Sequence, residues 1–247
     1  MIKEAAKDIF FIEPPDGGNV CIIKTSDGLV MVDSGFLRHK NFVLKKMNQM
    51  DLDPKDICLG FISHPHCDHV GGMGWWREKY DFPVVANEIV AEPIETADPV
   101  ITGTEFAYLD FDAEFYPCPI AEKTSSEDKT FHVGDKSFQV SHAPGHTIGS
   151  IHILCDEILF VGDTLFSNGA IGWIDVHWGS HPEDYAETLE RMRKYCGNMV
   201  FAGHGKEYIL GEDLIDKAKE IVSFYFNPEH GLGMPRVTSQ YNRNAAK

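Results

Sequence analysis

The sequence predicts an α+β protein in which two sheets pack face to face and helices cover their outer surfaces. Three observations predict this fold. Apolar runs of strand length recur in both halves of the chain, segments with apolar residues at helical spacing accompany them, and turns rich in Gly, Pro and Asp lie between. Because a sheet or a helix must bury its apolar face against another element, two strand-rich halves with outer helices fit a layered sandwich.

The first half of the chain begins with strands, and a Pro-Pro-Asp-Gly-Gly turn joins the first two as a hairpin. Apolar residues at helical spacing then predict a helix over 39–50. The expected strands of this half are 8–13, 19–24, 28–32, 57–62 and 84–86, and its other expected helices are 75–80 and 88–95.

Residues 97–129 differ from their surroundings. They are rich in Asp, Glu, Pro, Phe and Tyr and show no sustained period. The sequence therefore predicts an irregular insertion at about 97–129 within a single domain spanning 1–247. Its length indicates a function, either as a wall of a pocket or as a contact between the subunits of a homodimer.

The strand pattern resumes in the second half. One expected helix begins near Ser180, with Pro182 in its first turn, where a missing N–H costs nothing. The polar tail that follows the last helix is expected to be loosely held. The expected strands are 130–133, 137–142, 150–155, 158–162 and 199–202, and the expected helices are 182–195 and about 212–226.

Composition and charge limit the function. The chain has 247 residues, 43% of them hydrophobic, and a formal net charge of -16. Nucleic acids and anionic lipids need clustered Lys and Arg, so we expect neither as a partner. No apolar run reaches the length of a membrane span, and the N-terminus lacks the apolar core of a signal peptide. These features predict a cytoplasmic protein with a small-molecule substrate.

The most informative motif is His-Pro-His-Cys-Asp-His at 64–69, directly after the fourth expected strand. Imidazoles and a carboxylate suit Zn²⁺ or a similar divalent cation. His64 and His66 are two residues apart and can point the same way from an extended loop. Asp68 and His69 then face a different direction, which predicts two metals rather than one.

Three later segments repeat one pattern, an apolar strand followed by a Gly-containing turn with a His or an Asp. They place His146, Asp163 and His204 at the ends of strands, where a neighbouring Gly allows close approach of the backbone. Each segment alone is weak evidence, because most such turns are structural. Together with the motif at 64–69 they predict a single composite site.

With the turn Asp33-Ser34-Gly35, these motifs resemble the metallo-β-lactamase superfamily along nearly the whole chain. The resemblance implies an αβ/βα four-layer sandwich with two metals at one edge, between the sheets. It also implies the role of each matching residue. The first metal would take His64, His66 and His146, the second would take Asp68, His69 and His204, Asp163 would bridge both, and Asp33 would brace the metal loop.

The resemblance implies two divalent metal ions, zinc in the first place, with iron or manganese as alternatives. In such a pair a bridging water loses its proton near neutral pH and attacks, while the metals polarise the carbonyl and stabilise the leaving group. No Ser or Cys nucleophile is needed. Asp68 is expected to be mainly a ligand that also holds or transfers a proton.

Further residues follow the bridging Asp and are candidates for the mouth of the site. His177 is expected to contact substrate or to relay a proton, although a loop beside a helix cap is the alternative interpretation. The residues expected to line a substrate pocket are Phe166, Trp173, Trp178 and His181.

The substrate class is the least determined inference. True β-lactamases of the superfamily generally lack the bridging Asp163, and Gly162-Asp163-Thr164-Leu165-Phe166 resembles glyoxalase II and related hydroxyacyl thioesterases. Lactonases of the superfamily commonly have a Tyr shortly after the bridging Asp. The nearest aromatic residue in this sequence is Phe166, which cannot donate a hydrogen bond to a carbonyl. We therefore expect hydrolysis of a small ester-like bond, a hydroxyacyl thioester or a lactone. β-Lactamase or phosphodiesterase activity at the same site is the enzymatic alternative, and a metal-binding regulatory protein is the non-enzymatic one.

Overall fold

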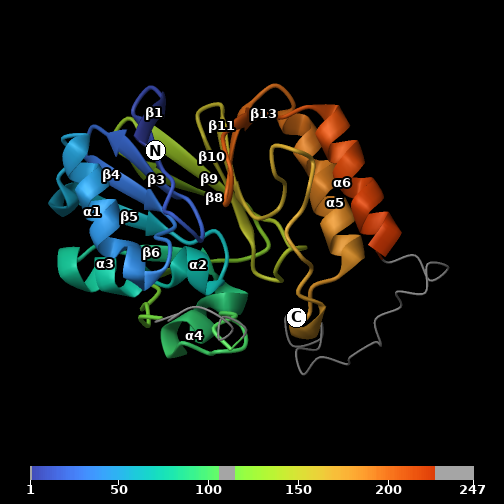
Figure 1. The fold of residues 1–247 in the computed structure, drawn as a ribbon, viewed down its shortest axis with the longest axis horizontal. Coiled ribbons are helices and arrows are strands. Elements are labelled where there is room, and N and C mark those ends of the chain that lie inside the picture. The colour runs from blue at the N-terminus through green and yellow to red at the C-terminus, as the bar shows by residue number, and fades with distance from the viewer. Residues whose placement is uncertain (1, 106–114, 226–247) are drawn as a thin grey trace.

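The computed structural model describes residues 2–105 and 115–225, which form two mixed sheets with helices outside them (Figure 1). In the first sheet of this described part, the strands lie in sequence order. They are β1 (Ile2–Ala6), β2 (Ile9–Ile12), β3 (Val20–Thr25), β4 (Gly28–Val32), β5 (Ile57–Phe61), β6 (Val84–Asn87) and β7 (Glu122–Thr124). The first four strands pair antiparallel, and β4 to β7 pair parallel.

The second sheet runs in the order β13-β12-β11-β10-β9-β8. Its described strands are β8 (Lys129–Val133), β9 (Lys136–His142), β10 (Ile151–Cys155), β11 (Ile158–Gly162), β12 (Met199–Ala202) and β13 (Tyr208–Ile209). All neighbours pair antiparallel except β11 and β12, which are parallel because α5 connects them.

Helices cover both outer surfaces, as Figure 1 shows with α1 and α3 on one side and α5 and α6 on the other. The helices are α1 (Lys40–Gln49), α2 (Cys67–Val70), α3 (Met73–Tyr80), α4 (Glu88–Thr96), α5 (Pro182–Met192) and α6 (Glu212–Tyr225), with short 3-10 turns η1 (Leu37–His39), η2 (Pro54–Asp56), η4 (Val176–Trp178) and η5 (Arg193–Tyr195).

Three buried apolar clusters define four layers. The central cluster lies between the sheets and includes Phe61, Phe138 and Phe201. One outer cluster joins the first sheet to α1, α3 and α4, with Trp76 fully buried in it. The other joins the second sheet to α5 and α6 around Tyr185. The predicted αβ/βα sandwich is therefore confirmed, because each sheet buries one face against the other sheet and one against helices.

The predicted strands and helices are present, with ends that differ by a residue or two. The expected helix over 182–195 ends at Met192 and tightens into η5. The edge strands β1, β7 and β13 and the single helical turn α2 were not predicted. β7, β13 and α2 are too short for a clear apolar period, and β1, with the sequence IKEAA, has no sustained apolar alternation.

The predicted irregular segment at 97–129 is only partly irregular. It contains β7, which pairs parallel with β6, and its Cys118 and Ile120 are buried against the first sheet. Part of the segment is therefore built into the sandwich. Residues 106–114 and the predicted loose tail from 227 lie outside the described residues, and the role of the segment in a subunit contact stays a prediction.

The fold brings the carboxyl ends of four strands to one edge. Asp33 follows β4 and His64 follows β5, while Asp163 follows β11 and His204 follows β12. Backbone hydrogen bonds join the two sheets there, from the N–H of Ile151 to the carbonyl of Ser63 and from Asn19 to Gly203, at 2.9 and 2.7 Å. Side chains from both halves of the chain consequently meet at this edge.

Candidate metal centre

All seven side chains predicted as metal ligands come together at this edge. Their ligand atoms form overlapping groups in which every pair of atoms lies within 4.8 Å. The groups are His64 with His66 and His146, His64 with His69 and Asp163, and Asp68 with His69 and His204. Cys67, which lies within the motif, is buried and belongs to none of these groups.

In the first group, ring nitrogens face a common centre. Nε2 of His146 lies 2.9 Å from Nδ1 of His66. His64 is only 1% exposed, and its buried Nε2 has no hydrogen-bond partner among the described residues. A buried imidazole nitrogen without a partner is costly unless something binds it. Three nitrogen atoms around one centre fit a divalent cation such as Zn²⁺.

The opposite nitrogen of each ring is held by a different partner. Nδ1 of His64 lies 2.9 Å from Oγ of Ser63. Nε2 of His66 donates to Oδ2 of Asp175 at 2.7 Å. Nδ1 of His146 donates to the carbonyl oxygen of Trp173 at 2.6 Å. Because a carboxylate and a carbonyl only accept, they place the proton on the outer nitrogen and leave the inner lone pair free for a metal.

The Asp68–His69–His204 group lies beside a second carboxylate, that of Asp163. Nε2 of His204 lies 3.2 Å from Oδ2 of Asp68 and 3.3 Å from Oδ2 of Asp163. Nε2 of His69 lies 3.4 Å from Oδ1 of Asp163. Asp163 also lies 3.9 Å from Nε2 of His146, in the first group. Its carboxylate therefore sits between the two groups, in the position that a bridging ligand needs.

Asp33 joins the two ends of the loop that carries the motif at 64–69. Its carboxylate accepts from the backbone N–H of Ser63 at 2.8 Å and from the hydroxyl of Ser63 at 2.6 Å. It also lies 3.2 Å from Nδ1 of His69. Asp33 consequently fixes His69 directly and orients His64 through the Ser63 hydroxyl.

The pKa values of the clustered histidines are shifted in opposite directions. Burial and neighbouring imidazoles lower the pKa of His64 well below its usual value and that of His146 to about 4. Burial opposes charge on His69 and His204, but adjacent carboxylates prevail, raising the pKa of His69 and bringing that of His204 to about 9. Burial likewise opposes ionisation of Asp163, yet His69 and the other rings lower its pKa to about 2. The carboxylate-rich side therefore holds protons that a metal would displace.

Two glycines allow the backbone to approach the cluster closely. A Cβ on Gly203 would lie 2.1 Å from Oδ1 of Asp163 and 2.5 Å from Cε1 of His69. A Cβ on Gly18 would lie 2.5 Å from the same His69 atom. Real Cβ contacts are never this short, so both positions require glycine. The close approach that the sequence predicted beside His204 is present at Gly203.

The predicted pocket residues are less uniformly placed. The ring of Phe166 lies 6.0 Å from that of His204, centroid to centroid. Trp173 is 81% exposed, and its carbonyl binds His146. Trp178 instead packs against the outer core of the first sheet. His181 precedes α5 without capping it through its side chain, and the described groups of ligand atoms do not include it.

His177 lies in η4, and its side chain is outside the described part of the structure. The catalytic role predicted for it therefore stays a prediction. Its neighbour Asp175 has the better-defined place. Asp175 directly precedes η4 in the N-cap position, and its carboxylate binds His66 instead of capping the turn.

Ser63, Asp175 and Asn19 were not predicted from the sequence, although they contact the predicted ligands or the loops that carry them. Ser63 directly precedes the metal motif, and that position was an available signal. Asp175 and Asn19 gave no such signal, because each binds a loop more than one hundred positions away in sequence.

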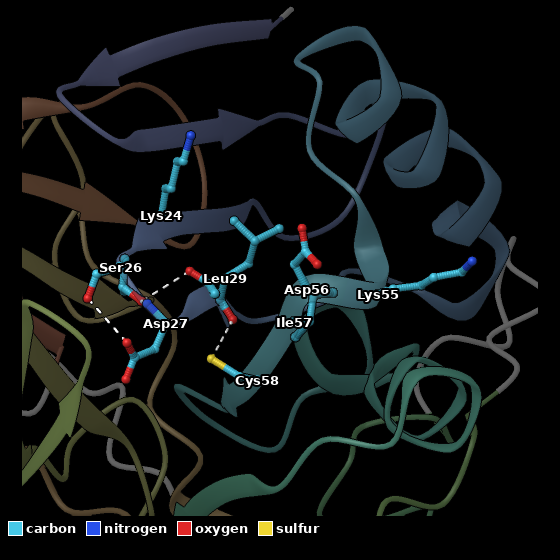
Figure 2. Close-up of a pocket in the computed structure, with 10 residues that line it drawn as sticks. Lys24, Ser26, Asp27, Leu29, Lys55, Asp56, Ile57 and Cys58 are labelled. Atoms are coloured by element: carbon cyan, nitrogen blue, oxygen red, sulfur yellow. Dashed lines mark hydrogen bonds between the residues drawn. The ribbon is translucent and has the colours of Figure 1, made fainter.

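A separate cavity of about 510 Å³ lies at the opposite ends of β4 and β5 (Figure 2). Its lining includes Lys24, Asp27, Lys55, Asp56 and Cys58. Figure 2 shows Ser26 and Asp27 hydrogen-bonded to each other there. Since this cavity is at the amino ends of the strands whose carboxyl ends lead to Asp33 and His64, it is distinct from the metal centre.

The chain resembles several curated relatives. It is 30% identical over 160 residues to an uncharacterised protein of Aquifex aeolicus, covering 63% of this chain and 72% of the relative. It is 27% identical over 196 residues to a hydroxyacylglutathione hydrolase of Idiomarina loihiensis, covering 78% of this chain but only 63% of that enzyme. A human acyl-coenzyme A thioesterase is 26% identical over 204 residues, with 74% and 69% covered.

Solved structures share the fold. GOB-18 of Elizabethkingia meningoseptica, a metallo-β-lactamase, superposes with a TM-score of 0.71 at 15% identity, covering 90% of this chain and 89% of the other. BLEG-1, a B3 metallo-β-lactamase, gives a TM-score of 0.68 at 22% identity, with 93% of this chain and 99% of the other covered.

In the described residues, every helix is too short or too polar to cross a membrane.

The family profile described as the metallo-beta-lactamase superfamily matches residues 14–204, which include all seven clustered side chains. Members of this family are metal-dependent hydrolases, and the His and Asp groups of this chain are able to hold metals. The chain therefore belongs to the metallo-β-lactamase superfamily.

Proposed function

We propose that this protein is a dinuclear metal hydrolase that cleaves a small ester-like bond, a hydroxyacyl thioester first and a lactone second. The position of Asp163 between the two ligand groups carries the proposal, because one carboxylate then serves two cations. The names of two relatives, a hydroxyacylglutathione hydrolase and an acyl-coenzyme A thioesterase, support the thioester. The substrate is a small molecule, without nucleic acid or membrane as a partner.

His64, His66 and His146 would hold one cation, and Asp68, His69 and His204 the other, with Asp163 shared. When bound, two such cations, zinc in the first place and iron or manganese otherwise, supply Lewis acidity and a hydroxide nucleophile near neutral pH. Both ligand groups are built from imidazole nitrogens and carboxylate oxygens, which are typical ligands of these metals.

Asp68 is suited to move a proton during the reaction. Its side chain is 24% exposed, whereas that of Asp163 is 10% exposed. Oδ2 of Asp68 lies 3.2 Å from Nε2 of His204. Because its carboxylate is the more exposed of the two, Asp68 is placed to accept a proton from the attacking water and return it to the departing thiol or alcohol.

The apolar residues beside the centre fit the remaining substrate. Phe166 lies next to His204 and provides an apolar contact on the carboxylate-rich side. It has no hydroxyl to donate to a carbonyl, and for this reason we rank the thioester above the lactone. Trp173 lies on the His146 side, where its exposed indole can contact an acyl group.

The test is turnover by protein reconstituted with zinc, iron or manganese, against hydroxyacyl thioesters, lactones, β-lactams and phosphodiesters. We expect thioester hydrolysis that chelation abolishes. Asp163→Ala and His66→Ala should each lose a metal and most turnover, whereas His132→Ala, an exposed change on β8, should lose neither.

The other outcomes identify the alternatives. Hydrolysis confined to β-lactams or phosphodiesters would replace the thioester with that substrate class. The mechanism would be overturned if the parent protein bound no divalent metal after reconstitution. It would also be overturned if the Asp163→Ala variant kept full turnover. Two bound metals without turnover on any of these substrates would favour a metal-binding regulatory protein.

A further inference from the structure

Asn19 is buried where the two halves of the chain meet at the metal centre. Its backbone N–H donates to the carbonyl of Gly203 at 2.7 Å. Its side-chain amide donates to the carbonyls of Ala202 and Gly205 at 3.1 and 3.0 Å. These three carbonyls surround His204 in sequence. One residue before β3 therefore holds the whole turn that presents this histidine.

Apart from Asn19, backbone rather than packed side chains holds this turn, since the N–H of Gly203 donates to the carbonyl of Gly162 at 2.7 Å. Gly203 and Gly205 lack side chains that pack, and Gly205 has a left-handed φ of +78°. The side chain of His204 is 38% exposed, so burial fixes its ring only in part. Because carbonyl oxygens only accept, both N–H bonds of the Asn19 amide are engaged, and the orientation of the amide is determined.

Gly18, the residue before Asn19, contacts the loop that carries Asp68, on the other side of the same site. The backbone N–H of Gly18 donates to the carbonyl of Asp68 at 2.9 Å. Asp68 and His204 lie 3.2 Å apart, Oδ2 to Nε2. The dipeptide Gly18-Asn19 therefore ties together the two loops that bring these side chains into contact. The other ligand group is held by different partners, namely Ser63, Asp175 and the carbonyl of Trp173.

We infer that Asn19 is a positioning residue that selectively sets the affinity of the Asp68–His69–His204 group for its metal. This inference rests on the proposed dinuclear function. Without the two amide donors, the turn at 202–205 keeps the backbone bond from Asn19 to Gly203 but loses the other two hydrogen bonds that Asn19 gives it. The distance between His204 and Asp68 is then less firmly held. The His64–His66–His146 group keeps its own supports, so its affinity should not change.

Asn19→Asp tests this inference with almost no change in shape. The carboxylate has no N–H to donate, and it places an oxygen opposite the two carbonyls. Asn19→Ser keeps one short donor and is the partial rescue. Asn48→Asp, on the exposed side of α1, is the matched control for the added charge. Metal-free protein of each variant is titrated with Co²⁺, and the two dissociation constants are fitted from the absorption of each bound ion.

The parent and Asn48→Asp should bind two ions. For Asn19→Asp we expect one of the two binding steps to lose about 10- to 100-fold in affinity, as when a ligand-orienting partner is lost, and the other step to be unchanged. Asn19→Ser should fall between. Circular dichroism and urea unfolding of the metal-free proteins check the fold, and Asn19→Ala replaces the Asp variant if that one does not fold.

Unchanged affinity for both ions in Asn19→Asp would overturn the inference, and so would equal weakening of both steps, which indicates general destabilisation. A parent protein that binds a single ion, or none, would instead contradict the proposed dinuclear function. The two failures are therefore distinguishable in one titration.

Discussion

Asp175 follows His66 by 109 positions in the chain, yet its Oδ2 lies 2.7 Å from Nε2 of the His66 ring. The carboxylate accepts, so the proton is on Nε2 and Nδ1 faces His146. Burial alone would lower the pKa of His66, but the hydrogen bond and charge of Asp175 raise it. A group outside the ligand set consequently decides which nitrogen of His66 is available for a metal.

Asp175→Ala should therefore weaken metal binding at the His64–His66–His146 group. Loss of such a partner lowers metal affinity by about 10- to 100-fold. Asp175→Asn keeps the shape but not the charge and should have a smaller effect. Competition with a zinc chelator measures the affinity, and Glu187→Ala, an exposed change on α5, is the control. Equal affinity in Asp175→Ala and Glu187→Ala would contradict the role of Asp175.

Gly203→Ala should disrupt the centre, because its Cβ would overlap Asp163 Oδ1 and His69, both buried. A shift of about 1 Å in a reacting group costs about 100-fold in rate, and we expect a loss of that size. The control is Gly211→Ala, whose Cβ also comes within 2.3 Å of a carboxylate oxygen. That oxygen belongs to the exposed Asp213, which can move away. Rates of thioester hydrolysis for the two variants check the prediction, and similar rates would contradict it.

Trp173→Ala should raise KM for substrates with an aromatic or long acyl group and leave kcat nearly unchanged. Loss of an aromatic contact of this kind should raise KM about three- to tenfold. Acetyl thioesters, which cannot reach the indole, should show no change. Ile209→Ala removes another exposed apolar side chain, on β13, and is the matched control. If KM rises equally for acetyl and aromatic substrates, Trp173 does not select the acyl group.

Metal binding should stabilise the fold. At free zinc 100-fold above its dissociation constant, each occupied site contributes about 2.7 kcal/mol, or roughly 5–11 °C in Tm for a chain of this size. Thermal unfolding of chelated and zinc-loaded protein measures the shift. Asp163→Ala should show a smaller shift than the parent, because this residue faces both ligand groups. An identical Tm with and without zinc would argue against a structured metal site.

Acid should destabilise the metal-free protein partly through His152. This residue is 5% exposed and pairs with the Thr164 hydroxyl, and burial, with nearby cationic side chains, lowers its pKa to about 3. The unfolded state takes up the proton near pH 6.5, so stability falls as pH drops below that value, by about 1.4 kcal/mol per pH unit, until pH approaches 3.

Urea unfolding of metal-free protein from pH 7 to pH 4 measures this slope. His152→Gln removes the titrating group and should reduce the slope by about one proton relative to the parent. His132→Gln, on the exposed part of β8, is the control with the same chemical change. A slope for His152→Gln that matches the parent would show that His152 does not contribute to acid sensitivity.

Much of the fold was predictable because its signals are local. The continuous apolar run at 57–62 predicted a buried strand, and β5 lies at Ile57–Phe61 in the parallel part of the first sheet. Strand β7, by contrast, is three residues long and polar, with two of its side chains exposed. Its place depends on pairing with β6, and no period in its own sequence could show that.

The amino-acid sequence by itself determined the family, the layered fold and the set of side chains that form the cluster. It did so because the motif at 64–69 and the Gly-flanked Asp163 and His204 directly follow strands, and strand ends are fixed by local apolar pattern. Only the tertiary structure decided how those side chains are held. Asn19 and Asp175 act on loops 183 and 109 positions away, and such hydrogen bonds exist only once the two sheets have packed together.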